Sequence, residues 1–198
     1  MKLRIHSDGL GLTKMIASTA LLALGALNSA DVLAYTYSTC DGNPIKWNNN
    51  SAVMYIDPVT IGTDSIWNQR LINAMEHWNN VQGSRFVFAA AQGTGGYSHG
   101  NNANEVYFSG PDDNDGDALA VTHRRMKCEW FFGWKSRIVE ADISFNNAYT
   151  WSPSVYQYNN RVEPINFEIV ALHELGHALG LGHENRRMAI MNSYYPNS

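Results

Sequence analysis

The sequence predicts an α+β fold in a single domain, on three observations. Short segments with β-strand character occur on both sides of a helical pattern near residue 70. That pattern carries an apolar stripe, which indicates a helix packed on a core. A second helical segment near the C-terminus carries a histidine-rich motif, HELGHALGLGH, at residues 173–183. The expected order is a strand region, a helix, four strands and a final helix, and residues 35–198 suffice for one domain with a core.

The predicted strands are short runs of β-type residues bounded by turn residues. The first strand region, residues 46–47 and 53–56, is interrupted by a turn rich in asparagine. The other predicted strands cover residues 85–91, 104–108, 119–123 and 137–145.

The first predicted helix begins at a capping residue, Thr63 or Asp64, and runs to about Val81, after which Gly83 stops it. Its apolar stripe consists of Trp67, Leu71, Ala74, Trp78 and Val81. His77 lies on this helix and is expected to be an ordinary surface or packing histidine.

The second predicted helix carries the residues with the clearest chemistry. Pro164 and Asn166 open it. The apolar face expected to pack on the sheet consists of Ile169, Leu172, Gly176 and Leu179. His173 and His177 are four residues apart, so both imidazoles lie on one helical face and can reach one ion. These two residues are therefore expected to face a cleft.

Further residues complete a candidate zinc site. Glu174 lies beside the ligands, where it can take a proton from a water molecule on the metal. Gly180 can adopt a positive φ, so the chain can leave the helix sharply and return His183 as a third ligand. Three protein ligands leave a fourth position for water, as in catalytic zinc sites. A bare H-E-x-x-H pattern also occurs by chance on amphipathic helices, but the glycine, the third histidine and Met191 in register favour zinc.

The pattern H-E-x-x-H-x-x-G-x-x-H followed by a methionine resembles the metzincin clan of zinc endopeptidases. Met191 lies eight residues after His183, and this short spacing is similar to that of the matrixin branch, where a Met-turn forms a hydrophobic floor beneath the metal. Residues 138–146 resemble the strand that bacterial matrixin-like proteins carry before the active-site helix. The resemblance implies a metzincin-like catalytic domain with a twisted, mainly parallel five-stranded sheet, an antiparallel edge strand, two long helices and a Met-turn.

The resemblance also implies a substrate cleft whose upper rim is an edge strand, to which a peptide adds as an antiparallel strand. The residues similar to that strand are Leu119, Ala120, Val121 and Thr122. The acidic loop before them is expected to favour basic residues in the substrate. Tyr194 and Tyr195 lie just past the Met-turn, where some metzincins use a tyrosine to stabilise the oxyanion. Because the nearest tyrosine is three residues after the methionine instead of the usual two, a place in the cleft wall is favoured.

The N-terminal 34 residues are predicted to be a secretory signal peptide. Three basic residues precede an apolar run at 15–27, and Ala34 closes an A-x-A-like cleavage site. An uncleaved anchor is the alternative, although the run is short for a membrane span. The expected product is a secreted or periplasmic monomer of residues 35–198 without stable membrane insertion. The formal charge of −4 and the lack of a basic patch argue against nucleic acid as a partner.

The two cysteines, Cys40 and Cys128, are expected to form a disulfide, because an even pair in an exported protein most often does so. A competing interpretation is that Cys40 acts as a thiolate ligand that keeps the enzyme latent, and Asp41 could act similarly through its carboxylate. The usual matrixin prodomain motif is missing from the sequence.

One loop concentrates four carboxylates, which could bind Ca²⁺ through hard oxygen ligands. These residues are Asp112, Asp113, Asp115 and Asp117. Their register does not fit an EF-hand, and a solvated acidic turn is the alternative. Matrixins bind structural ions near the corresponding loop, but Val121 and Ser144 stand where animal matrixins place zinc-binding histidines, and only His99 remains as a candidate. The family's downstream acidic calcium ligands are replaced here by Asn146, Ala148 and Tyr149. A second, structural zinc is not expected.

The sequence therefore predicts a secreted zinc-dependent endopeptidase that hydrolyses peptide bonds with a zinc-activated water and with Glu174 as general base. One alternative is an inactive or latent zinc protein that captures peptides or surface polymers without cutting them. Another is a structural secreted domain with an accidental metal site. The intact base, Glu174, favours the enzyme.

Overall fold

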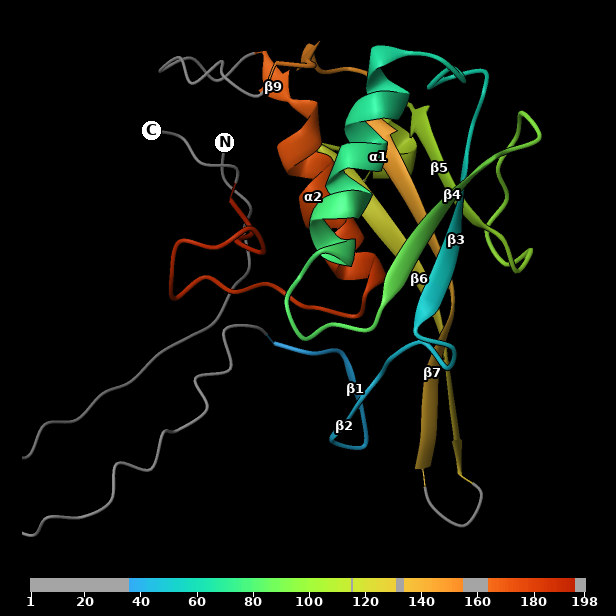
Figure 1. Cartoon of the computed structure of the whole chain (residues 1–198), viewed down its shortest axis with the longest axis vertical. Helices are drawn as coiled ribbons and strands as arrows, with labels where there is room; N and C mark the ends of the chain where they lie inside the picture. The colour runs from blue at the N-terminus through green and yellow to red at the C-terminus, as the bar shows by residue number, and fades with distance from the viewer. Residues whose placement is uncertain (1–35, 115, 131–133, 155–163, 195–198) are drawn as a thin grey trace, which may run out of the picture. The chain divides into compact units, whose positions relative to one another are not determined.

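Figure 1 shows a computed structural model of the chain, which describes residues 36–194 except 115, 131–133 and 155–163. The predicted α+β fold is confirmed, because a five-stranded sheet carries the helices α1 and α2 on one face. In chain order the elements are β1 (Thr39–Cys40), β2 (Asn43–Pro44), β3 (Ser51–Ile56), α1 (Ile66–Asn79), β4 (Val87–Gln92), β5 (Asn104–Ser109), the 3₁₀ turn η1 (Pro111–Asn114), β6 (Ala120–Trp130), β7 (Trp134–Asn146), β8 (Trp151–Ser152), β9 (Ile165–Asn166) and α2 (Phe167–Ala178).

The five-stranded sheet has the strand order β4-β3-β5-β7-β6. Neighbouring strands from β4 to β7 are parallel, and β6 runs antiparallel to β7 at one edge. This is the mainly parallel sheet with an antiparallel edge strand that the family resemblance implies. β6 and β7 are longer than predicted, because their pairing continues beyond the predicted segments to Trp130 and Trp134.

Residues 46–47 do not form the predicted strand. Lys46 makes only an isolated bridge to Arg137 of β7. Trp47 instead packs against the core, and its Nε1 donates a hydrogen bond to the carbonyl of Ala178 at 2.8 Å. This segment therefore connects the N-terminal region with the end of α2.

α1 begins slightly later than predicted. Ser65 caps it, and the hydroxyl of Ser65 accepts a hydrogen bond from the Asn68 N–H at 3.0 Å, which satisfies one of the unpaired amides at the helix start. The helix ends at Asn79, so Val81 lies outside it and is 46% exposed. The apolar stripe therefore ends at Trp78. His77 lies on the surface, as expected, with Nε2 3.3 Å from the carboxylate of Glu168.

α2 begins at the predicted place but packs on the core through a different face. Asn166 caps it by accepting a hydrogen bond from the Ile169 N–H at 3.1 Å. The side chains that it buries in the core are Phe167, Val170, Ala171, Leu175 and Ala178. Of the predicted face, Leu172 and Leu179 are partly buried against the core, whereas Gly176 lies against Trp78 of α1 and against Met191. α2 is covered on more than one side, so a single apolar stripe does not define its orientation.

β7 separates two environments. Its residues Ala141, Ile143 and Phe145 face the helices and are fully buried in the apolar core. The alternate residues on the opposite face are buried polar side chains, namely Glu140, Asp142, Ser144 and Asn146. Loops at residues 98–103 and 111–118 bind this polar row through hydrogen bonds.

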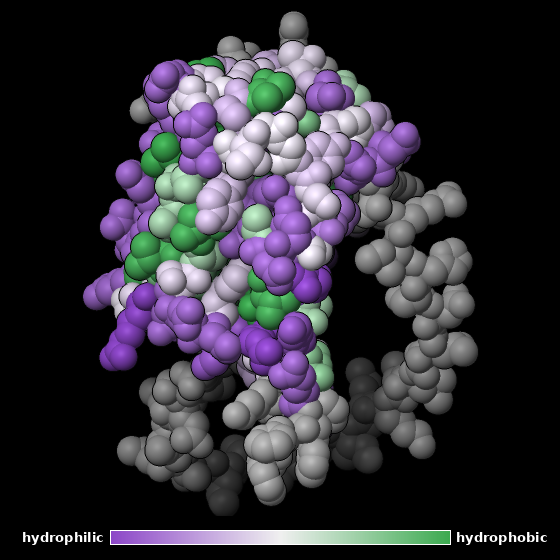
Figure 2. Space-filling model, turned by 90° about the vertical axis from the view of Figure 1, so that its right-hand side faces the viewer, coloured by the Kyte–Doolittle hydropathy of each residue, from purple (hydrophilic) through white to green (hydrophobic). Residues whose placement is uncertain are grey.

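Figure 2 looks onto the side of the molecule where β3 and β4 lie in Figure 1, and hydrophilic and apolar residues are interleaved there. Val53, Tyr55 and Val87 are partly exposed large apolar residues of these two strands. Among the described residues, no helix has the length and apolar character needed to cross a membrane.

Candidate metal centre

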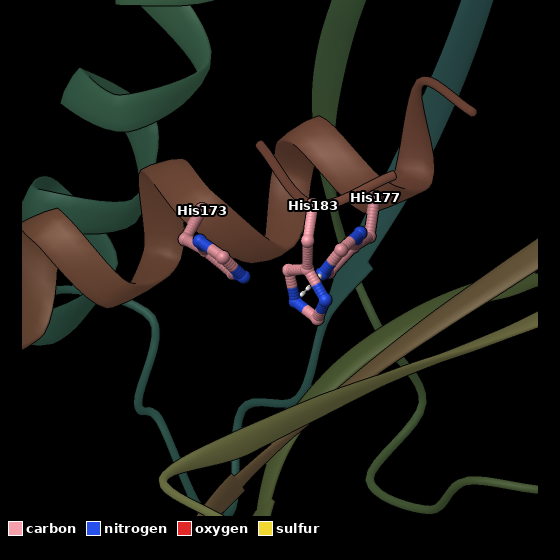
Figure 3. Close-up of side chains that lie close together, drawn as sticks. All are labelled: His173, His177 and His183. Carbon is pink, nitrogen blue, oxygen red and sulfur yellow. Dashed lines mark hydrogen bonds between the residues drawn. The ribbon is translucent and has the colours of Figure 1, made fainter. Parts of the chain in front are cut away.

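Three histidines converge at the C-terminal half of α2, as predicted. His173 and His177 project from the helix, and His183 reaches the same point from the loop that follows it (Figure 3). Gly180 makes this return with a φ of +102°, a conformation that favours glycine. The potential ligand atoms of the three histidines lie within 4.8 Å of one another. His177 Nε2 and His183 Nε2 are 3.1 Å apart.

Backbone carbonyls orient two of the imidazoles. His173 Nδ1 lies 2.7 Å from the carbonyl of Ile190, and His177 Nδ1 lies 2.9 Å from that of Leu181. A proton on Nδ1 in each ring leaves Nε2 as the ligand atom, which is the usual supporting contact for metal-binding histidine. Burial lowers the pKa of all three histidines, to about 3 for His177. Neutral imidazoles are the form that binds zinc, so the donor set fits this ion.

Glu174 lies between the two helical ligands in sequence and is buried, with 5% of its surface exposed. The hydroxyl of Thr122 in β6 lies 2.6 Å from Glu174 Oε2, to which it donates, and 3.0 Å from the Glu174 carbonyl. Burial raises the pKa of Glu174 to about 7, while the Thr122 hydrogen bond and the charge of Arg124 act in the opposite direction. A carboxylate with this pKa can accept and release a proton near neutral pH.

Met191 forms a buried floor under the helix that carries the ligands. It is fully buried, and its sulfur lies where a side chain on Gly176 would project. The carbonyl of Met191 accepts a hydrogen bond from the Glu184 N–H at 2.7 Å, which ties the turn to the residue after the third histidine. This arrangement is the Met-turn that the sequence resemblance implies.

A family model described as matrixin matches residues 46–198 of this chain. The chain belongs to the matrixin family. A similar relative is "Matrix metalloproteinase-B" from Caenorhabditis elegans, which is 32% identical over 101 residues. That match covers 51% of this chain and 19% of the relative, so this chain matches only about a fifth of the relative's length. Membership of a family of zinc metalloendopeptidases agrees with the histidine triad.

The loop that carries His183 in this matrixin is held by the N-terminal segment, which the sequence did not reveal. Thr36 accepts the Gly182 N–H at 2.7 Å through its carbonyl and donates its hydroxyl to the His183 carbonyl at 2.9 Å. The Ser38 N–H donates to the Gly180 carbonyl at 3.1 Å. No motif signals these contacts, because they are mainly backbone pairings.

The predicted disulfide between Cys40 and Cys128 is present and ties the N-terminal segment to β6. Cys40 is therefore not a thiolate ligand of the metal, and that interpretation is wrong. Asp41 lies in the tight turn between β1 and β2, where it is exposed. The sequence identified the cysteine pair but not its role in holding the segment beside the third histidine.

The residues that follow the triad in sequence differ in their burial and in their contacts. The buried Glu184 forms an ion pair with Arg186 at 2.8 Å, and the hydrogen bonds from Arg186 hold the pKa of Glu184 at about 2. Tyr194 is 53% exposed, and its N–H donates to the Asn192 side chain at 3.0 Å. Tyr195 lies outside the described residues.

The acidic loop of the matrixin forms η1 and the turn after it. Asp112 is exposed, and the Asp113 carboxylate accepts the Tyr97 hydroxyl at 2.9 Å. Asp117 offers its carbonyl to the Tyr149 hydroxyl, and Asp115 lies outside the described residues. In the described part of the chain, the triad is the one group of three or more His, Cys, Asp or Glu side chains placed to hold a metal ion. His99 instead pairs with Asp142 at 2.8 Å.

Proposed function

We propose that this matrixin is an exported zinc endopeptidase. The observation that carries the proposal is the convergence of three imidazoles, two of which project from the helix that also carries a buried carboxylate. His173, His177 and His183 would hold the zinc, and the fourth position would remain open. When bound there, zinc supplies Lewis acidity toward water and toward the substrate carbonyl.

In this proposal, the residues of the chain handle the proton. Glu174 accepts it from the attacking water and passes it to the leaving amine, which its pKa of about 7 allows near neutral pH. The hydrogen bond from Thr122 fixes the position of Oε2 and so orients the base. Thr122 is therefore proposed to be a positioning residue.

The substrate is proposed to be a peptide bound along β6. In the described sheet, β6 pairs with β7 on one side, which leaves its other edge for an added strand. Leu119 precedes β6, and Ala120, Val121 and Thr122 are its first residues. Thr122 lies beside Glu174. This position supports antiparallel addition of the substrate backbone next to the base.

Export is also proposed. The predicted signal peptide, residues 1–34, lies outside the described residues, and the support comes from the Cys40–Cys128 disulfide, which persists in oxidising compartments. Activity as a monomer is a proposal of the same kind. For Asp112, Asp113, Asp115 and Asp117 we propose the alternative of a solvated acidic turn that does not bind Ca²⁺.

The experiment that tests the proposal is digestion of a diverse peptide library by the zinc-loaded protein without its predicted signal peptide. The matched blank is Glu174→Ala, which is expected to keep zinc and to lose turnover, while His177→Ala is expected to lose both. Cleavage by the wild type alone would support the endopeptidase. Zinc binding without cleavage by either protein would favour the alternative of a zinc-containing binding protein.

A further inference from the structure

Arg124 projects from β6 toward the candidate metal centre. Thr122 and Arg124 pair with Ile143 and Ala141 of β7, whose side chains lie in the core under the helices. Both β6 side chains therefore lie on the helix side of the sheet. Arg124 Nη1 donates to the carbonyl of His177 at 3.2 Å. The guanidinium thus lies next to a proposed zinc ligand.

Arg124 differs in its partners from most of the other arginines that the structure describes. Four described arginines form ion pairs with carboxylates: Arg70 with Glu168, Arg125 with Glu140, Arg137 with Glu129 and Arg186 with Glu184. Arg124 is partly buried and forms no ion pair with a described residue. The charge of Glu174 acts on Arg124, but no hydrogen bond or ion pair joins the two described side chains. A cation taken partly out of water without a directly bonded carboxylate favours a partner that arrives with the substrate.

The contact with α2 does not explain why an arginine occupies position 124. The carbonyl of His177 already accepts the N–H of Gly180 at 2.8 Å, so the helix end is satisfied without the arginine. A guanidinium has five N–H donors in a planar fork that matches a carboxylate. Only one hydrogen bond from Arg124 is formed with the described residues, so donors remain for a ligand.

We propose that Arg124 determines specificity by binding an acidic side chain of the peptide substrate on the N-terminal side of the scissile bond. The proposal rests on the proposed function. Thr122 marks the reacting position on β6 because it binds Glu174. In antiparallel addition, substrate residues before the scissile bond lie beside the β6 residues that follow Thr122. Arg124 is two residues further along, or about 7 Å.

This assignment opposes the expectation that the acidic loop favours basic residues. The carboxylate of Asp113 accepts the Tyr97 hydroxyl, and its carbonyl lies 3.2 Å from His123 Nε2. His123 pairs with Asp142, so it lies on the face of the sheet opposite to Arg124. The charged side chain of β6 nearest to Glu174 and the triad is therefore the positive Arg124.

The test compares peptides that differ only by Glu, Gln or Lys at each of the three positions before the scissile bond. The kcat/KM of each is measured for the zinc-loaded wild type, Arg124→Gln, Arg124→Lys and Arg124→Glu. Lys127→Gln is the matched control, because it removes the same charge from an exposed position of the same strand. Zinc content and unfolding midpoint are recorded for every variant, and binding of the same peptides is measured in a Glu174→Ala background.

The wild type is expected to prefer Glu over Gln at one position by about tenfold, the effect of a charge-assisted hydrogen bond. The preference should disappear in Arg124→Gln, turn toward Lys in Arg124→Glu and survive in Lys127→Gln. A wild type that shows no Glu preference, or that prefers Lys, would overturn the assignment without any variant, as would a Glu preference that persists in Arg124→Gln. Absence of cleavage together with an Arg124-dependent binding preference would instead refute the proposed hydrolysis and keep the assignment.

Discussion

Glu174 and Glu140 are both buried glutamates, with 5% and 1% of their surfaces exposed, but they lie on opposite sides of the sheet and have opposite properties. Glu174 accepts one side-chain hydrogen bond, from Thr122. Burial therefore dominates and raises its pKa to about 7. Burial alone would also raise the pKa of Glu140, but hydrogen bonds from Gly100, Arg125 and Asn102 outweigh it and lower that pKa.

The comparison shows that burial by itself does not mark a catalytic carboxylate. A buried carboxylate surrounded by donors is held in its charged form and stabilises the loop that supplies the donors. A buried carboxylate with few donors can change its protonation state near neutral pH, and this property suits a general base. Replacing each glutamate by glutamine separates the two roles, because the change keeps the shape and removes the charge.

The largest expected effect is on turnover in Glu174→Gln. Loss of the general base should lower kcat by roughly 10²- to 10⁴-fold, while zinc content stays at one ion per chain. The folded state should be no less stable than the wild type, because a buried carboxylate is removed. Single-turnover kinetics and metal analysis measure both effects. A kcat of Glu174→Gln close to that of the wild type would show that Glu174 is not the general base and does not differ from Glu140 in this respect.

Glu140→Gln should show the reverse pattern. Loss of charge-assisted hydrogen bonds to Gly100, Asn102 and Arg125 should lower the free energy of unfolding by about 3 kcal/mol, while turnover persists. The folded pKa of Glu140 is lowered, so its stabilisation is complete above the unfolded value of about 4.3 and is lost as the pH falls through the folded pKa. Urea unfolding at pH 7 and at stepwise lower pH measures the difference between variant and wild type. A difference that does not shrink toward low pH would contradict this assignment.

The convergence of the histidines and the place of Glu174 beside them could be predicted from sequence, because a helix fixes the relative positions of its residues locally. His173, Glu174 and His177 need only the helical period, and Gly180 needs only the freedom to adopt a positive φ. The cysteine pair could be predicted because the chain has two cysteines and its first 34 residues are predicted to be a signal peptide. These features depend on short stretches of sequence or on simple counting.

Other parts of the site depend on tertiary contacts that no local pattern encodes. The Thr122 hydroxyl reaches Glu174 across 52 positions of sequence, and Thr36 reaches His183 across 147. The predicted core face of α2 is wrong in part: Leu172 and Leu179 pack against the core, but Gly176 contacts Met191 and Trp78 of α1 instead of the sheet. The alternation of polar and apolar residues in β7 is visible in sequence, but the burial of its polar row depends on distant loops.

A smaller effect is expected from Gly176→Ala, which tests the floor beneath the metal-binding helix. The new methyl group would overlap the Met191 sulfur and lie 3.1 Å from Trp78 Cζ2. Overpacking costs about 1–3 kcal/mol, and the gain in helix propensity offsets about 1 kcal/mol of this. Thermal unfolding and zinc titration should therefore show a modest loss of stability and weaker zinc binding. A variant with wild-type zinc affinity would show that Met191 adjusts without moving the ligands.

The smallest effect on stability is expected when calcium is added. The side chains that bear on this prediction belong to the polar row of β7. The Asn146 side-chain amide donates to the carbonyls of Gly116 and Ala118 at 3.1 and 3.0 Å, and the Ser144 hydroxyl donates to Asn114 Oδ1 at 2.8 Å. These hydrogen bonds hold oxygens of the acidic loop through side-chain donors of β7. Adding millimolar Ca²⁺ to calcium-free protein at constant zinc should leave the Tm unchanged. A rise of several degrees that Asp112→Asn or Asp117→Asn abolishes would show that the loop binds calcium, because a ligand that binds only the folded state raises its stability by RT ln(1 + c/Kd), where c is the concentration of free ligand.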